Sequence, residues 1–235
     1  MIEAVHRKPQ PLGRSTLKLV PRSLAALLFA EAVSHHLYAD EALFVAGQTC
    51  DGCYRLEKGL LKIVVTSPRG KARILAILGP GAIVGELTVT DKGPRWASVF
   101  AMIDCELSFI RRSVFEEKTI RHPEIYQYLM NVLVDRLQQA DEAVAAMSFL
   151  TTRARLARAL LELASHVGED DGAGRVVIRH KIGQSDLAAM AGVARENVSR
   201  VMSDWKRRNV VTRSSGFYCL VDMTALKRST NSVAR

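Results

Sequence analysis

The sequence predicts an α+β protein in which an all-β N-terminal domain is followed by one long helix and a second, mainly helical domain. Three observations support this prediction. Short apolar runs separated by glycines occupy residues 41–109, an uninterrupted helical pattern occupies 122–150, and two short helices meet at a glycine within 181–211. We therefore expect domains at residues 1–121, 122–150 and 151–235.

The composition describes a globular chain with a basic C-terminal part. Hydrophobic residues make up 48% and charged residues 24% of the sequence, unlike a disordered protein. The net charge is +9, of which residues 151–235 carry +7. This local excess favours contacts with nucleic-acid phosphates over an enzyme for acidic substrates.

Targeting signals are not apparent. The sequence has no run of 18 apolar residues, and the best candidate, residues 23–33, is short and contains Glu31, so we expect no membrane contact. The basic N-terminus lacks the apolar core and cleavage site of a secretion signal. Together with only four cysteines, these features predict a cytoplasmic protein.

The N-terminal region begins with residues 1–22, which contain three prolines and little periodicity, and we expect a loosely ordered lead-in there. Residues Arg22 to Tyr38 then have the pattern of a short amphipathic helix, with Leu24, Leu28 and Val33 on one side.

The next region favours an antiparallel β jelly roll or barrel, because many short strands alternate with glycine turns. The glycines nearest the breaks include Gly47, Gly52, Gly59, Gly70 and Gly79. The expected strands are Ala42–Val45, Cys53–Leu56, Leu60–Thr66, Arg73–Leu78, Ala82–Val84, Ser98–Met102 and Glu106–Ile110.

A helix is expected over His122 to Leu150, where no glycine occurs and Pro123 is the last proline. Apolar residues recur along it in steps of four and three, as in a coiled coil, so two identical helices would pack against each other as a homodimer. The alternative is a helix buried on its own β-domain. The dimer residues would be Tyr126, Met130, Leu133, Leu137, Ala140, Val144 and Met147.

The C-terminal part begins with a predicted helix at Arg153 to Val167, followed by an acidic, glycine-rich loop at Gly168 to Gly174. Strands are expected at Val176 to Arg179 and at Gly216 to Val221, the latter after a turn at Arg213 to Gly216. These strands flank the two short helices and would form a wing.

The two short helices have the pattern of a helix-turn-helix. Leu187 and Ala188 lie on one apolar face, Gly192 permits a sharp turn, and Val198 restarts the period. The second helix begins near Arg195. Its outward side would carry the types of side chain that contact base edges in a major groove, namely Arg195, Glu196, Ser199 and Arg200. The alternative is the solvated face of an ordinary helix pair.

This order of parts resembles the Crp/Fnr family of bacterial regulators, which includes the cyclic AMP receptor protein and the fumarate-nitrate reduction regulator. Residues 79–87 and 91–95 are similar to its phosphate-binding cassette, and residues 195–200 to its recognition helix. The resemblance implies a homodimeric transcriptional regulator that binds promoter DNA at an inverted repeat, and RNA polymerase if it activates. An arginine at position 195 implies GTGA-like half-sites.

The resemblance also implies a cyclic AMP or cyclic GMP site, formed by Gly85, Glu86 and Leu87 together with Arg95. The sequence departs from the family's pattern at four positions. Trp96 replaces the usual Ser or Thr, Ala140 and Asp141 replace two hydroxyl residues that contact the base, and Ala194 replaces a helix-capping Ser. A retained nucleotide site, another effector and a ligand-independent roll therefore remain open.

Other chemistry has less support in the sequence. Cys50 and Cys53 are the only close cysteine pair and suit a redox switch or a core position. We expect no metal or iron–sulfur cluster, because no further ligands have metal spacing. No catalytic triad or carboxylate pair is recognisable, so we expect no enzyme. A cyclic-nucleotide-responsive signalling subunit that does not bind DNA is the remaining alternative.

Overall fold

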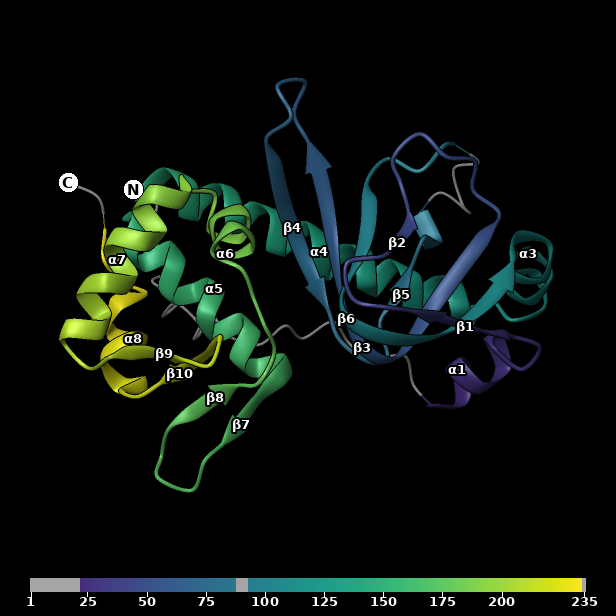
Figure 1. Cartoon of the computed structure of the whole chain (residues 1–235). Helices are drawn as coiled ribbons and strands as arrows, with labels where there is room; N and C mark the ends of the chain where they lie inside the picture. Colours follow the sequence, from purple (N-terminus) through teal and green to yellow (C-terminus); the bar gives the residue numbers. More distant parts are fainter. Residues whose placement is uncertain (1–21, 88–92, 234–235) are drawn as a thin grey trace, which may run out of the picture.

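The computed structural model describes residues 22–87 and 93–233, which form a β-roll, a long helix and a helical C-terminal half (Figure 1). Residues 1–21 of the expected lead-in and residues 88–92, which include the start of the second cassette segment, lie outside the described residues. Within the described residues, no helix is both long and apolar enough to cross a membrane.

The N-terminal domain is an antiparallel roll, as the sequence predicts. Its strands follow the order β1-β6-β3-β4, with β2 paired to β6 and β5 paired to β3. The strands are β1 (Val33–Leu37), β2 (Ala42–Phe44), β3 (Gly52–Thr66), β4 (Ala72–Leu78), β5 (Ile83–Val84) and β6 (Ser98–Arg111).

Two predictions for this domain are wrong in detail. The two short strands expected before and after Gly59 form one continuous strand, β3. The two expected before and after residue 104 likewise form one strand, β6. Gly59 has φ +101° beside register shifts in the ladder, so it forms a bulge and does not end the strand. The expected helix from Arg22 is also shorter: α1 spans Arg22–Leu28, and β1 follows because its residues pair with β6.

Two helices leave the roll. The first, α3 (Arg112–Arg121), was not predicted from the sequence. The second, α4 (Glu124–Phe149), agrees with the predicted long helix within two residues at each end. Its first two turns are buried through Ile125, Leu129 and Val132, and they pack with α1 and β3 residues in one apolar cluster.

The C-terminal half has the predicted winged helix-turn-helix order, with a four-stranded sheet β7-β8-β10-β9. Its elements are α5 (Thr152–Val167), β7 (Gly168–Asp170), β8 (Val176–Ile178), α6 (Gln184–Ala191), α7 (Arg195–Arg207), β9 (Val211–Ser214), β10 (Phe217–Leu220) and α8 (Met223–Ser229). The expected loop at Gly168 begins instead as β7, which pairs with β8. Helix α8 was not predicted.

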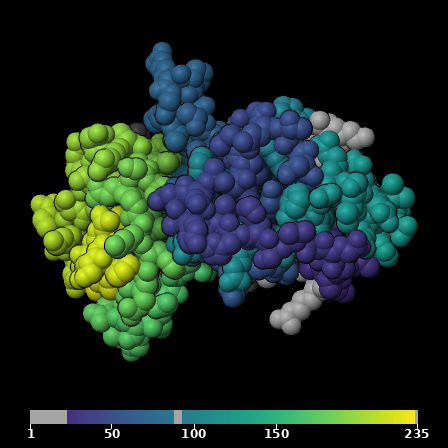
Figure 2. Space-filling view, turned by 45° about the vertical axis from the view of Figure 1, so that its right-hand side comes forward, coloured from purple at the N-terminus to yellow at the C-terminus, as the bar shows by residue number. Residues whose placement is uncertain are grey.

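The two halves share a core. Leu60, Val64 and Ile74 of the roll belong to the same buried cluster as Leu187 and Ala188 of α6. Figure 2 shows the C-terminal lobe, green to yellow, against the blue and purple roll, with the tip of the β3–β4 hairpin projecting beyond both. The C-terminal half is therefore packed directly on the β-roll of the same chain.

Candidate functional site

The turn between α6 and α7 depends on Gly192. This residue has φ 62° and ψ 40°, a left-handed conformation that glycine adopts without strain. The following amide, Val193 N, donates to Ala188 O at 3.0 Å and closes the end of α6. A Cβ at Gly192 would also overlap the guanidinium of Arg73 on β4, so a side chain here would have to displace the end of Arg73.

Helix α7 has one buried and one exposed face. Val198, Met202 and Trp205 are buried against the shared core. The four side chains predicted to contact base edges are all exposed in the structure, and we call them the recognition face: Arg195, Glu196, Ser199 and Arg200. The structure thus places these four residues on the solvent side of the second helix of the motif, where a duplex can reach them.

Contacts between a side chain of α5 and two residues of α7 hold α7 in position. Arg153 donates to the Asp204 carboxylate with an Nη2–Oδ2 distance of 2.6 Å, and its guanidinium lies 5.8 Å from the Trp205 ring centroid. The Arg153 hydrogen bond holds the pKa of Asp204 below its ordinary value, so this carboxylate stays charged. Because α5 is part of the core, this bridge orients the recognition face relative to the rest of the domain.

Helix α7 has no side-chain cap at its start and carries a basic residue beside a cleft near its end. At its start Ala194 supplies no side-chain cap, as the sequence predicts, and only backbone bonds close the first turn. Near its end Lys206 lines a cleft of about 150 Å³ between α7 and the wing, together with Ser199 and Arg213. Lys206 and Arg213 are basic groups beside the recognition face that the sequence analysis did not single out.

The seam predicted on α4 is exposed in this single chain. Met130, Leu137 and Val144 are 61%, 64% and 59% exposed, and Tyr126, Leu133, Ala140 and Met147 are exposed as well. These seven residues, which we call the α4 seam, lie on a different face from Ile125, Leu129 and Val132, which pack on the roll. The contact with its own β-domain therefore leaves this apolar stripe uncovered.

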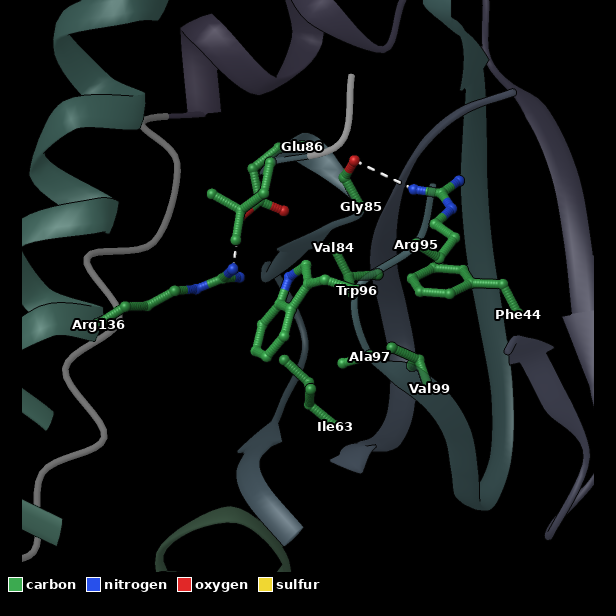
Figure 3. Close-up of a pocket in the computed structure, with 11 residues that line it drawn as sticks. Phe44, Ile63, Val84, Gly85, Glu86, Arg95, Trp96, Ala97, Val99 and Arg136 are labelled. Atoms are coloured by element: carbon green, nitrogen blue, oxygen red, sulfur yellow. Dashed lines mark hydrogen bonds and ion pairs between the residues drawn. The ribbon is translucent and has the colours of Figure 1, made fainter. Parts of the chain in front are cut away.

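The sensor pocket lies between β5, β6 and α4 (Figure 3). Gly85, Glu86, Leu87, Arg95 and Trp96 all line it, so the structure brings these predicted residues together. The remaining lining residues are Phe44, Ile63, Val84, Ala97, Val99 and Arg136. The open space is about 20 Å³, and one water molecule needs roughly 10–15 Å³.

Arg136 is the main pocket residue that the sequence analysis missed. It forms an ion pair with the buried Glu86 carboxylate and donates to Ile83 O at 3.0 Å. Burial raises the pKa of Glu86, and the positive charge of Arg136 opposes this rise. A sequence signal existed, because Arg136 lies four residues before Ala140 and hence on the same side of α4.

Arg95 is buried and bound to other parts of the roll. Its Nη2 donates to Gly52 O at 2.7 Å and pairs with Asp51 Oδ1 at 3.1 Å, while Nη1 donates to Gly85 O at 3.1 Å. The guanidinium also lies 4.1 Å from the ring centroid of Phe44. Asp51 had no assigned role in the sequence analysis.

Ala140 and Asp141 are not brought to the pocket. Both are exposed on α4, and in the described part of the chain Arg136 is the α4 residue that lines the cavity. The donor types around the pocket suit a cyclic nucleotide, but the space does not accommodate one in this arrangement of side chains.

Cys50 and Cys53 have core positions. Cys53 is fully buried, and burial raises its pKa well above the ordinary value, so the thiol is held in its neutral form. Cys50 is also buried and its Sγ lies 3.6 Å from Gly52 O. Within residues 22–87 and 93–233, no group of three His, Cys, Asp or Glu side chains is placed to hold a metal ion.

The fold and the exposed helix define a winged helix-turn-helix protein with an N-terminal β-roll domain. Comparisons with known proteins agree with this class: a cyclic nucleotide-binding domain matches residues 34–122 and a Crp-like helix-turn-helix domain matches 154–229. The cyclic AMP receptor protein of Thermus thermophilus is 35% identical over 175 residues, covering 74% of this chain and 77% of that protein. The chain belongs to the Crp/Fnr family of transcriptional regulators.

Other relatives extend this result. The CRP-like cAMP-activated global transcriptional regulator of Mycobacterium tuberculosis is 28% identical over 186 residues, covering 79% of this chain and 83% of that protein. A solved CRP/FNR-family transcriptional regulator, also from Thermus thermophilus, has a TM-score of 0.73 at 24% identity, covering 86% and 100% of the two chains, and shows the same fold. The chain is accordingly a DNA-binding transcriptional regulator, and the family is not one of enzymes.

Proposed function

We propose that this protein is a cytoplasmic homodimer that regulates transcription by binding an inverted-repeat operator in double-stranded promoter DNA. The observation that supports this most directly is the recognition face, which is exposed on a helix whose opposite side is buried in the shared core. In dimeric helix-turn-helix proteins the two recognition helices enter successive major grooves about one turn apart. The excess charge of the C-terminal part supplies phosphate contacts.

Each residue of the recognition face has a proposed role. Arg195 and Arg200 donate to O6 and N7 of guanines, and Glu196 accepts from a cytosine amino group, each contact discriminating by about 1 to 3 kcal/mol. Ser199 hydrogen-bonds at an adjacent position. With Arg195 present, the preferred half-site is GTGA-like.

The α4 seam provides the surface for a two-fold symmetric dimer. Its exposed residues recur at heptad spacing and most of them are large and hydrophobic, so they match the surface that two identical helices bury against each other. A second copy packed there places two recognition helices on one face of the duplex, and the operator is then an inverted repeat. If the protein activates transcription, RNA polymerase is a further partner.

For the sensor pocket we propose a cyclic nucleotide, cyclic AMP or cyclic GMP, as the effector. The amides of the glycine turn at Gly85, the carboxylate of Glu86 and the guanidinium of Arg95 suit a cyclic phosphate and a ribose hydroxyl. Ala140 and Asp141 provide no pair of hydroxyls for the base, so selectivity differs from that of the cyclic AMP receptor protein.

A second candidate is an effector-independent regulator. The observation that favours it is the space of about 20 Å³ left in the sensor pocket, too little for a nucleotide without movement of side chains. Under this alternative the β-roll is a structural support for the dimer and for the DNA-binding half.

The experiment is a binding titration on a duplex with two GTGA half-sites in inverted repeat, with and without cyclic AMP or cyclic GMP. We expect wild-type protein to bind this duplex and Arg195→Ala to bind it at least fivefold more weakly, since one bidentate contact contributes about 1 to 3 kcal/mol. Arg121→Ala is the matched control, because it removes an exposed arginine at the far end of the molecule from α7 (Figure 1). No binding in any condition would contradict the proposal.

A further inference from the structure

The anion partners of Arg95 come from the protein itself. Three of the five N–H groups of its guanidinium are directed at Gly52 O, Gly85 O and the Asp51 carboxylate. The side chain is 2% exposed, so a ligand phosphate cannot reach it while these neighbours stay in place. The arginine that would hold the phosphate of an effector is therefore already bound to a carboxylate.

Among the residues that the structure describes, the charges near the pocket form two ion pairs. Two guanidiniums, Arg95 and Arg136, face two carboxylates, Asp51 and Glu86. A cyclic phosphate brings one more negative charge into a largely buried site, where it competes with these carboxylates for the guanidiniums.

Asp51 is the carboxylate that can leave at small cost. Its side chain is 65% exposed, whereas that of Glu86 is 3% exposed and bound to Arg136. An ion pair with one partner in water contributes little, so Asp51 can turn to solvent and release one side of Arg95.

Trp96 occupies the other part of the pocket. Figure 3 shows its indole between Arg136 on one side and the apolar wall of Ile63 and Ala97 on the other. The residue is 54% exposed, so its indole covers the cavity from the solvent side. The apolar wall that the indole covers is the part of the pocket that suits a nucleobase.

From these observations we infer that the effector site is self-occupied: the Asp51 carboxylate binds Arg95 in place of a phosphate, and the Trp96 indole covers the apolar wall in place of a base. A cyclic nucleotide then has to displace two side chains of the chain itself, and Asp51 and Trp96 set the effector affinity. This inference rests on the proposed nucleotide site in the β-roll.

The test is calorimetric titration of cyclic AMP and cyclic GMP into four full-length proteins: wild type, Asp51→Asn, Trp96→Ser and the double variant. We expect each single variant to bind at least one nucleotide about twofold to fivefold more tightly than wild type, because a competing contact worth up to about 1 kcal/mol is removed. The double variant should bind most tightly. Glu106→Gln is the matched control, because it breaks an exposed carboxylate–lysine pair elsewhere in the roll and should leave the affinity unchanged.

Two further measurements separate the possible outcomes. Thermal unfolding of each variant shows that the roll is folded, and Asp51→Ser replaces Asp51→Asn if the latter is not. The inference is overturned if the folded variants bind no more tightly than wild type, or if none of them binds at millimolar nucleotide. Operator binding by the same preparations tests the proposed DNA-binding function separately, since that function does not require an effector site.

Discussion

Lys62 on β3 and Asp186 on α6 form an ion pair that joins the sensor domain to the DNA-binding half. Their Nζ–Oδ1 distance is 2.8 Å, and the two side chains are only 14% and 29% exposed. The pair lies where α6 packs on the roll beside the shared apolar core. Because α6 is the first helix of the motif, this contact fixes the orientation of the recognition face relative to the pocket.

Removing this ion pair should lower the stability of the junction. We expect a double-mutant cycle with Lys62→Met and Asp186→Asn to give a coupling energy of about 1 kcal/mol, measured by urea unfolding. The exposed pair Lys58–Glu106 is the control, and its coupling should be close to zero because both side chains are largely in water. Equal coupling energies for the two pairs would show that Lys62 and Asp186 do not hold the halves together.

Gly192 should be the least replaceable glycine of the motif. Gly192→Ala places a Cβ at positive φ and against the Arg73 guanidinium, so we expect a loss of roughly 2 to 4 kcal/mol in the free energy of unfolding. Gly172→Ala is the control, because Gly172 also has positive φ but nothing within 4 Å of an added Cβ. It should cost about 1 kcal/mol. A similar cost for both variants would mean that Arg73 moves away freely.

Glu162 should make the stability depend on pH. Burial raises the pKa of this α5 carboxyl to about 7, above the value near 4.3 expected in the unfolded chain. The folded state therefore holds a proton that the unfolded state has released, and stability falls as pH rises between these two values. We expect Glu162→Gln to match wild type near pH 4 and to be more stable by on the order of 2 kcal/mol at pH 8, measured by urea unfolding.

His166 lies one turn from Glu162 and acts in the opposite direction. Burial lowers its pKa, so its contribution to stability is lost as pH falls from its unfolded value near 6.5 through the lower folded value. Wild type and Glu162→Gln both contain His166, so the difference between their free energies of unfolding reports on Glu162. A difference that stays constant from pH 4 to pH 8 would contradict the assigned pKa.

The α4 seam should control the oligomeric state. Leu137→Lys puts a charge at the centre of the predicted dimer interface, and we expect this variant to sediment as a monomer at micromolar concentration where wild type is a dimer. Ile120→Lys changes a residue on α3 that is even more exposed, at 76%, and should remain a dimer. Wild-type protein that sediments as a monomer would remove the basis for an inverted-repeat operator.

Local patterns in the sequence predicted much of the fold. The heptad spacing from Tyr126 predicted α4, and Gly192 with its flanking apolar residues predicted the helix-turn-helix, because both signals lie within a few turns of chain. Predictions that depended on single glycines were weaker. Gly59 bends a continuous strand, since pairing with β6 on both sides outweighs its effect on the backbone.

The sensor pocket was only partly predictable, because some of its contacts join residues far apart in the chain. Glu86 and Arg95 were expected from the cassette, but their partners Arg136 and Asp51 are 50 and 44 residues away in the chain. Such long-range ion pairs have no local signature. The strand at Val33–Leu37 was likewise missed because its register is set by β6, about 70 residues later.

Selection of binding sites from a pool of randomised duplex DNA, using the full-length protein, tests the central claim most directly. The account predicts enrichment of two GTGA-like half-sites in inverted repeat, with centres about one helical turn apart. It also predicts that Arg195→Ala loses the preference at one base pair of each half-site. Enrichment of single or directly repeated sites, or an unchanged preference with Arg195→Ala, would contradict the account.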